Sequence, residues 1–195
     1  MLTTAHLFSG GGGDTEGAIA AGYKPLWAIE ADKVAAAIYR YRFPHVTLVE
    51  ADIITLSDSF IRCLPVPGLL IGGSPCQDLS VAGSRAGISG SRSSLFFEFV
   101  RCLRLLQPRA FIFENVPGLL STGGGRDFET VIRSFAQLGY MGSWQVRSGQ
   151  RWIPQNRKRV FIVGIRQRAI TNTHTEQADA ARVLGITRDY SRPSR

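Results

Sequence analysis

Residues 3–22 read TTAHLFSGGGGDTEGAIAAG, and the order of residue types in this stretch indicates the fold class. Residues 3–8 predict a first strand, the glycines a tight loop, and residues 15–21 a helix that ends at Gly22. A strand, a glycine loop and a helix open a nucleotide-binding βαβ unit, because the glycines let a ligand approach the backbone while helix N–H groups face it. A flexible turn accounts for a glycine run equally well, so the following segment must decide.

The following segment places acidic residues where a nucleotide would need them. Residues 25–29 predict a second strand that ends in Glu30, about twenty positions after the glycine loop, where a carboxylate can accept hydrogen bonds from ribose hydroxyls. Asp32 is interpreted as the cap of the next helix. Asp52 follows a third predicted strand, residues 46–49, and there it either binds an adenine amino group or starts a turn.

A thiol is expected at the same edge of the sheet. The apolar run of residues 68–71 leads into Gly-Gly-Ser-Pro-Cys-Gln at residues 72–77. This pattern predicts a buried strand that delivers Cys76 to its carboxyl end, where open α/β sheets bind ligands. Pro75 restricts its own backbone and that of the preceding residue, so the approach to the thiol is stiff. Such a turn suits a catalytic nucleophile, whereas a lone cysteine is more often buried and inert.

A glycine-rich, basic segment follows the thiol. Residues 83–92 contain Arg85 and Arg92 and favour a loop that closes over a ligand. The two arginines either reach phosphates or belong to a solvated loop. Residues 93–106 then predict an amphipathic helix, because their apolar side chains recur at helical spacing.

A second carboxylate ends another buried strand. Residues 110–113 are apolar and run directly into Glu114, a further candidate at the carboxyl edge. A dense basic cluster precedes the apolar strand of residues 160–164, and strand alternation puts Arg157 and Arg159 on one face. Paired arginines indicate recognition of an anion or a base, and a solvated edge strand is the alternative.

Composition narrows the class of protein. The 195 residues are 44% hydrophobic and carry a net charge of +8, which favours a polyanionic partner such as nucleic acid. The sequence predicts no signal peptide and no membrane span, so a cytoplasmic protein is expected, associated with the nucleoid if bacterial. Three cysteines without a metal or disulfide spacing suggest reduced thiols and no metal site. Cys63 and Cys102 lie in apolar stretches and are interpreted as core residues.

Taken together, the pattern predicts an α/β fold with a doubly wound, mostly parallel sheet. Residues 126–139 predict a helix capped by Gly139, and residues 143–148 another strand. One domain is expected over residues 1–165. Residues 166–195 form a polar tail with a short helical pattern at residues 175–184 and an ending typical of disorder.

The full set of motifs resembles the cytosine-C5 DNA methyltransferases. The resemblance covers Thr4 to Gly164, and its most specific elements are Pro-Cys-Gln, Glu-Asn-Val and Gln-x-Arg-x-Arg, which occur in the family's order and approximate spacing. It implies a Rossmann-like, S-adenosylmethionine-dependent methyltransferase fold. The matching stretches are residues 8–13, Glu30, Asp52, residues 75–77, residues 114–116 and residues 155–159.

The resemblance also implies a mechanism. C5 of cytosine is a poor nucleophile, and addition of the Cys76 thiolate to C6 would make the ring react as an enamine toward a methyl group. Glu114 would bind the N3 edge and the exocyclic amine of the base and stabilise developing charge. Arg159, and Arg157 beside it, would hold the base carbonyl or the Cys76 loop. The base must leave the duplex to reach the thiol, so base flipping is implied.

Further roles follow from the same match. The residues that the resemblance implies to bind S-adenosylmethionine are Phe8, Ser9, Gly10, Gly11, Gly12, Gly13, Glu30, Asp52, Ile53, Pro75 and Leu95. Those implied to contact DNA are Gln77, Ser80, Arg85, Arg92 and Gln155.

The sequence departs from the family after Gly164, because neither a target-recognition region nor the family's final segment is recognisable there. A second polypeptide that supplies them, a truncated or decayed copy, and an isolated catalytic core each account for this. A non-catalytic subunit that binds S-adenosylmethionine or DNA and a tRNA cytosine methyltransferase are the alternative functions. A nicotinamide oxidoreductase would fit the glycine loop alone. The target sequence cannot be read from these residues.

Overall fold

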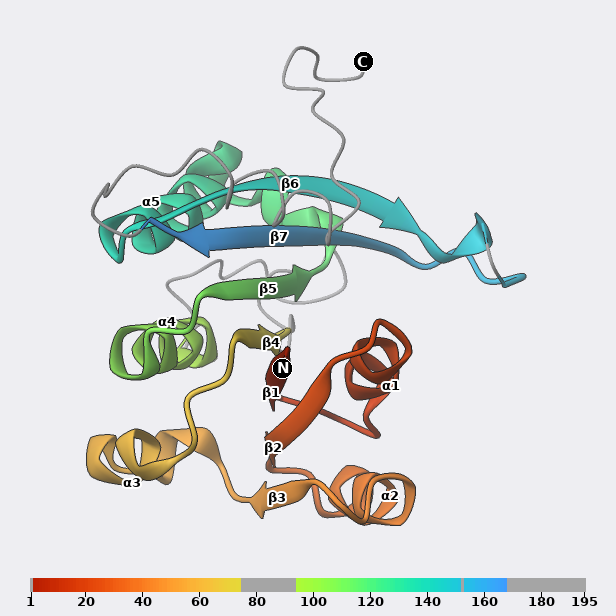
Figure 1. Cartoon of the computed structure of the whole chain (residues 1–195). Helices are drawn as coiled ribbons and strands as arrows, with labels where there is room; N and C mark the ends of the chain where they lie inside the picture. Colours follow the sequence, from red (N-terminus) through yellow and green to blue (C-terminus); the bar gives the residue numbers. More distant parts are fainter. Residues whose placement is uncertain (1, 75–93, 152, 168–195) are drawn as a thin grey trace.

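A computed structural model describes residues 2–74, 94–151 and 153–167. Its seven strands form one sheet in the order β3-β2-β1-β4-β5-β7-β6 (Figure 1). The strands are β1 (Thr3–Leu7), β2 (Lys24–Glu30), β3 (Thr47–Glu50), β4 (Leu69–Gly72), β5 (Ala110–Asn115), β6 (Tyr140–Ser148) and β7 (Lys158–Arg166). Neighbouring strands from β3 to β5 pair in parallel, whereas β7 is antiparallel to both β5 and β6. The predicted doubly wound, mostly parallel sheet is confirmed.

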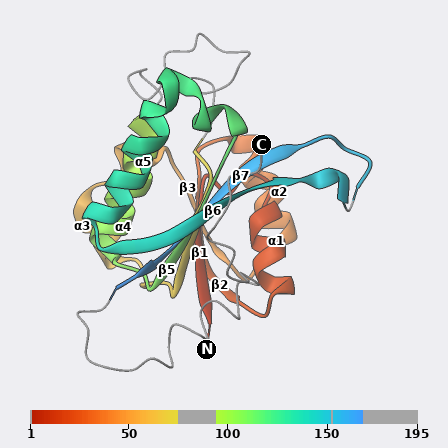
Figure 2. The ribbon, with the colours of Figure 1, turned by 90° about the horizontal axis from the view of Figure 1, so that it is seen from above.

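Helices cover the two faces of the sheet unequally. Of the helices in the described residues, two lie on one face, α1 (Gly13–Ala20) and α2 (Lys33–Arg42). Three lie on the other, α3 (Asp58–Cys63), α4 (Ser94–Leu106) and α5 (Arg126–Gln137) (Figures 1 and 2). Short 3₁₀ turns join them: η1 (Ile53–Thr55), η3 (Pro117–Leu120), η4 (Thr122–Gly125) and η5 (Gly149–Arg151). In the described part of the chain, no helix lies over β7 and β6 on the side of the sheet that faces away from α4 and α5 (Figure 2).

An aromatic cluster forms the centre of the core between the sheet and the α4–α5 face. Phe99 from α4, Phe111 and Phe113 from β5, and Phe135 from α5 are at most 3% exposed, and the Phe111 and Phe135 ring centroids lie 4.3 Å apart. Burial of this apolar area is the main driving force that holds the helices on the sheet. Cys102 is fully buried in the same cluster, as predicted.

The prediction that Cys63 belongs to the core is wrong, because this residue is exposed. It ends α3, a helix of six residues whose one buried side chain is Ile61. Cys63 follows Ile61 by two positions and so points to another side of so short a helix.

Most element boundaries agree with the sequence prediction to within a few residues. The first helix starts at Gly13, two residues early, directly after Gly12 in the left-handed conformation. Strand β6 starts at Tyr140 because the tyrosine ring packs in the core and its hydroxyl donates to the Pro108 carbonyl at 2.8 Å. Helix α5 ends at Gln137, and Gly139 with a φ of +80° follows, as its predicted capping role requires.

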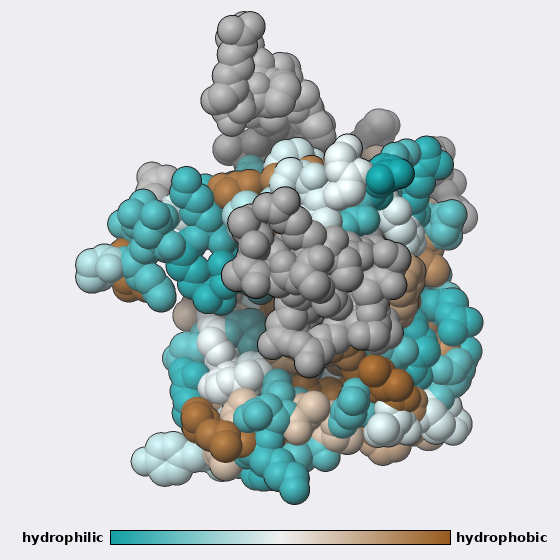
Figure 3. All heavy atoms as spheres, turned by 180° about the vertical axis from the view of Figure 1, so that it is seen from behind, coloured by the Kyte–Doolittle hydropathy of each residue, from teal (hydrophilic) through white to brown (hydrophobic). Residues whose placement is uncertain are grey.

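Hydrophilic residues dominate the surface seen in Figure 3, and apolar residues appear there as separate small patches. No helix among the described residues is long and apolar enough to cross a membrane. The predicted helix at residues 175–184, and the rest of the tail from residue 168, lie outside the described residues.

Candidate functional site

The carboxyl ends of β1, β2, β4 and β5 meet at one edge of the sheet, which we call the carboxyl edge. The parallel register aligns Leu7 with Ile29 on one side and with Gly72 on the other, and Gly72 in turn with Phe113. The ends of these four strands therefore lie at the same level, and they are followed by the glycine loop, Glu30, Gly73 and Glu114. This edge brings together the candidate residues that the sequence placed after separate strands.

The glycine loop has a compact, strained backbone. Phe8, Gly10 and Gly12 all have positive φ values, of 56°, 54° and 84°. A Cβ atom on Gly12 would lie 2.2 Å from the ring of Phe43, the residue that caps the end of α2, so only glycine fits there. The loop can therefore pass close over α2, and it presents its backbone to the carboxyl edge.

Glu30 is tied to the loop by backbone hydrogen bonds. Its Oε2 accepts from the Gly10 N–H at 2.7 Å, and its Oε1 accepts from the Asp32 N–H at 2.8 Å. Two carboxylate oxygens offer about four acceptor positions, so Glu30 keeps capacity for hydroxyl donors. Asp32 caps α2 by accepting from the Ala35 N–H at 2.7 Å, as predicted.

Asp52 starts a turn, which was one of the two roles considered from sequence. Its Oδ1 accepts from the Ile54 N–H at 3.0 Å and so caps η1. Asp52 is exposed, whereas the neighbouring Ile53 is 3% exposed and belongs to the core. The adenine-binding role of Asp52 stays a prediction.

Glu114 is held by an arginine from β7. Arg159 Nε lies 2.7 Å from Glu114 Oε1, while Arg157 Nη2 lies 3.9 Å from the same oxygen. The antiparallel register aligns Glu114 with Phe161, which brings Arg159 to the end of β5. The predicted common face of the two arginines thus faces a carboxylate.

Gly73 was missed as a site residue from sequence. A Cβ atom there would lie 2.6 Å from Glu114 Oε2 and 3.0 Å from the Glu114 carbonyl oxygen. Glycine at this position leaves room for the Glu114 side chain next to the residues that lead to Cys76. The paired glycines before Pro-Cys-Gln were the available sequence signal.

A buried polar chain beneath the glycine loop was also missed. His6 is fully buried, and its Nδ1–H donates to Asp14 Oδ2 at 2.8 Å. Its Nε2 lies 2.9 Å from Thr4 Oγ1. Next along α1, Thr15 Oγ1 lies 2.9 Å from the Tyr39 hydroxyl. Burial raises the pKa of Tyr39 to about 12, so the phenol remains a hydrogen-bonding group across the neutral range. These contacts connect β1, α1 and α2 behind the loop.

Several predicted site residues lie outside the described part of the chain: Pro75, Cys76, Gln77, Ser80, Arg85 and Arg92. Leu95, in the first turn of α4, is half-buried against the core. Gln155 is exposed in the turn between β6 and β7, where its carbonyl accepts from the Arg157 N–H at 2.9 Å. No group of three or more metal-ligating side chains occurs within residues 2–74, 94–151 and 153–167.

Comparison with known proteins identifies the family of proteins that shares this fold and this site. A family model of C-5 cytosine-specific DNA methylases matches residues 2–190, and the chain belongs to this family.

Individual relatives agree with this family. The chain is 35% identical over 164 residues to the type II methyltransferase M.Sau96I of Staphylococcus aureus, covering 83% of this chain and 38% of that protein. It is 35% identical over 174 residues to the type II methyltransferase M.AquIA of a Picosynechococcus strain, covering 82% and 70% respectively.

A similar solved structure is that of a protein assigned as a DNA modification methyltransferase encoded within an Escherichia coli prophage. It has a TM-score of 0.72 and 27% identity, and the match covers 85% of this chain and 47% of that one. The methyltransferase fold expected from sequence is thereby confirmed. The chain spans less than half the length of M.Sau96I and of this structure.

Proposed function

We propose that this chain is the catalytic core of a DNA cytosine-C5 methyltransferase. It would transfer a methyl group from S-adenosylmethionine to C5 of a flipped cytosine through a covalent bond between Cys76 and C6. The observation that carries the proposal is the carboxyl edge, where Glu114, paired with Arg159 at 2.7 Å, shares one rim with the glycine loop. Family membership supports the same activity.

The glycine-loop side of the edge fits the cofactor that methyltransferases generally use. Ser9 Oγ is buried and has no hydrogen-bond partner among the described residues, which leaves it available to a ligand. A Cβ on Gly10 or Gly13 would meet nothing within 4 Å, so a ligand can approach the backbone there. Glu30 would accept from ribose hydroxyls, and Asp52 and Ile53 would hold the adenine. The bound cofactor supplies an electrophilic methyl group.

The chemistry of the base would fall to Cys76 and Glu114. The Cys76 thiolate would form the bond to C6, and electron density would move to C5. C5 would then take up the methyl group as the methyl–sulfur bond breaks, and S-adenosylhomocysteine would leave with the electron pair of that bond on its sulfur. Water would then take the C5 proton, and the electron pair left at C5 would restore the C5–C6 double bond. The Cys76–C6 bond would break with its electron pair on sulfur, which releases methylated cytosine and restores the thiolate. Glu114 would hold the N3 edge of the base and stabilise the charge that develops there.

Arg159 would set the position of Glu114 during these steps. Its side chain is 23% exposed and its guanidinium keeps a fixed positive charge beside the carboxylate. The net charge of +8 supports DNA as the polyanionic substrate, since neutralised phosphates release counterions. Gln155, on the turn that precedes Arg157 and Arg159, would contact the DNA.

A second polypeptide that supplies target recognition is part of the proposal. It is supported by the β7-β6 surface on the side away from α5, over which no helix of the described residues lies. There Phe161 and Val163, with Ile112 of β5, line a cavity of about 230 Å³. A chain that binds cofactor but needs such a partner for turnover is the alternative outcome.

The decisive experiment is transfer of a labelled methyl group from S-adenosylmethionine to mixed-sequence DNA. We expect incorporation by the wild-type chain, alone or with an added partner, and none by Cys76→Ser. Cys63→Ser is the matched control, because Cys63 is exposed at the end of α3 and should leave the rate unchanged. Transfer to tRNA and not to DNA would replace the DNA proposal with an RNA one. Cofactor binding without turnover, even with partner chains, would contradict catalysis.

A further inference from the structure

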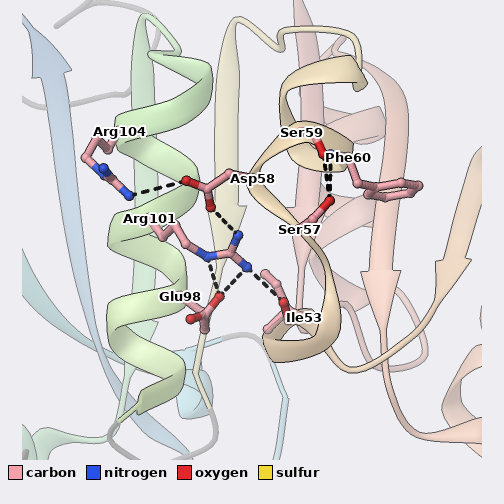
Figure 4. Close-up of polar contacts among 8 residues, drawn as sticks. All are labelled: Ile53, Ser57, Asp58, Ser59, Phe60, Glu98, Arg101 and Arg104. Carbon is pink, nitrogen blue, oxygen red and sulfur yellow. Dashed lines mark hydrogen bonds and ion pairs between the residues drawn. The ribbon is translucent and has the colours of Figure 1, made fainter.

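Arg101 links α4 to the loop that follows β3. Its Nε donates to Glu98 Oε2 at 2.7 Å, its Nη1 to Asp58 Oδ1 at 2.9 Å, and its Nη2 to the Ile53 carbonyl at 2.9 Å (Figure 4). The Arg101 side chain is 16% exposed. One guanidinium thus engages three elements: α4, the first residue of α3 and the 3₁₀ turn η1.

Arg104 provides a natural comparison on the same helix. Its Nη2 lies 3.7 Å from Asp58 Oδ2, and its side chain is 58% exposed (Figure 4). It touches neither Glu98 nor Ile53 in Figure 4. An exposed pair at this distance contributes little, whereas a half-buried guanidinium with several aligned acceptors fixes geometry.

The electrostatics favour a permanently charged Arg101. Burial opposes the charge, but hydrogen bonds to Glu98 and Asp58 outweigh it and raise the pKa of Arg101 above its ordinary value. Arg101 therefore stays charged at neutral and alkaline pH.

The linked elements carry proposed cofactor residues. Asp52 caps η1, and Ile53 is its first residue, while Leu95 lies in α4 almost two turns before Arg101. Ile53 belongs to the main core cluster, and Leu95 packs against that cluster. The bond from Arg101 to the Ile53 carbonyl sets where this turn sits relative to α4.

We infer that Arg101 is a positioning residue that holds the Asp52–Ile53 turn against α4 and thereby sets the affinity for the adenosine end of the cofactor. This inference rests on the proposed cofactor roles of Asp52, Ile53 and Leu95. Arg101 touches neither cofactor nor base in this scheme. It acts through the backbone of Ile53.

The test uses the full chain with S-adenosylhomocysteine as the probe, and compares wild type with Arg101→Met and Arg104→Met. We expect the dissociation constant to rise about tenfold in Arg101→Met, because a hydrogen bond from a charged donor to the turn is lost. Amide exchange at Ile54, Thr55 and Leu56 should also become faster. Arg104→Met should stay within about twofold of wild type in both measurements.

The outcomes separate this inference from the proposed function. No binding by wild type would overturn the cofactor site itself, and with it this inference. Binding by wild type with unchanged affinity and exchange in Arg101→Met would overturn the role of Arg101 alone, as would a lower melting temperature with unchanged affinity. If Arg101→Met fails to fold, Arg101→Lys keeps the charge but not the three-way link, and the same affinity and exchange measurements then decide.

Discussion

The two sides of the carboxyl edge hold their carboxylates by different means. On the β1–β3 side, Glu30 and Asp52 accept hydrogen bonds from backbone N–H groups of Gly10, Asp32 and Ile54. On the β5–β7 side, Glu114 is held by the guanidinium of Arg159. One side therefore relies on partial charges of the main chain, and the other on a full positive charge carried by a side chain.

This difference suits the tasks proposed for the two sides. Backbone donors come with the turn that carries them, so they fix the shape of a site that only has to bind. A guanidinium adds a charge that can stabilise a carboxylate while the electron distribution of a bound base changes. We infer that the first side is built for affinity and the second for catalysis.

Glu114→Gln should separate the two sides of the carboxyl edge most strongly. The change keeps the size of the side chain but removes the charge that faces Arg159, so we expect methyl transfer to fall about 10² to 10³-fold. The affinity for S-adenosylhomocysteine should stay within about twofold of wild type. Single-turnover transfer and calorimetric binding measure the two quantities. A variant that keeps more than about a tenth of the rate would place the critical charge elsewhere.

The two arginines should differ by more than tenfold in importance. Arg159 lies 2.7 Å from Glu114 and is 23% exposed, whereas Arg157 lies 3.9 Å away and is 53% exposed. We expect Arg159→Met to lower transfer roughly 30-fold and Arg157→Met less than about threefold, since an exposed, loose ion pair contributes little. Equal losses of methyl transfer in the two variants would mean that both arginines act by binding DNA phosphates. In that case each substitution would weaken the salt dependence of DNA binding.

Local patterns explain why the β1–β3 side was well predicted from sequence. The strand, the glycine loop, Glu30 and the Asp32 cap lie within about thirty residues, and each follows from short-range rules of turns and caps. Asp52 shows the limit of such rules, because a carboxylate after a strand can cap a turn or bind a ligand. The structure shows the cap.

Long-range contacts explain what sequence reasoning missed. The pairing of Arg159 with Glu114 depends on the antiparallel register of β7 against β5, which no local pattern specifies. Arg101 looked like one charge on an amphipathic helix, and its bond to Ile53 spans 48 positions. Cys63 was misassigned because apolar neighbours in a sequence do not reveal how short the helix is.

Removal of a backbone-held carboxylate should affect affinity alone. Glu30→Gln leaves one acceptor oxygen for two N–H donors, so we expect S-adenosylhomocysteine to bind about tenfold more weakly. Transfer at saturating cofactor should stay within about twofold of wild type. Asp32→Ala is the matched control: loss of the α2 cap should cost about 1 kcal/mol of stability with unchanged affinity. A fall in the saturated rate of Glu30→Gln would contradict the division between the two sides.

Two buried groups, the Tyr39 phenol and the Cys102 thiol, should lower the stability of the folded protein at alkaline pH. Burial raises the pKa of Tyr39, on the β1–β3 side, to about 12 from 10.0, and the pKa of Cys102, in α4, to about 12 from 9.0. Both groups stay protonated in the folded state and ionise first in the unfolded state. Their contribution is therefore complete below the unfolded pKa and is lost as pH rises toward 12.

Because the unfolded thiol ionises one unit lower, Cys102 should dominate this loss. At pH 10 the linkage relation gives about 1.4 kcal/mol for the thiol and about 0.4 kcal/mol for the phenol. Urea unfolding measures the free energy of unfolding at pH 7 and at pH 10. We expect the difference between the two pH values to shrink by about 1.4 kcal/mol in Cys102→Ala and by about 0.4 kcal/mol in Tyr39→Phe. The comparison uses the difference between the two pH values, so the cavity left by each substitution cancels. If the change in unfolding free energy between pH 7 and pH 10 is equal in the two variants, helix α4, which also carries Arg101, opens before the rest of the molecule unfolds.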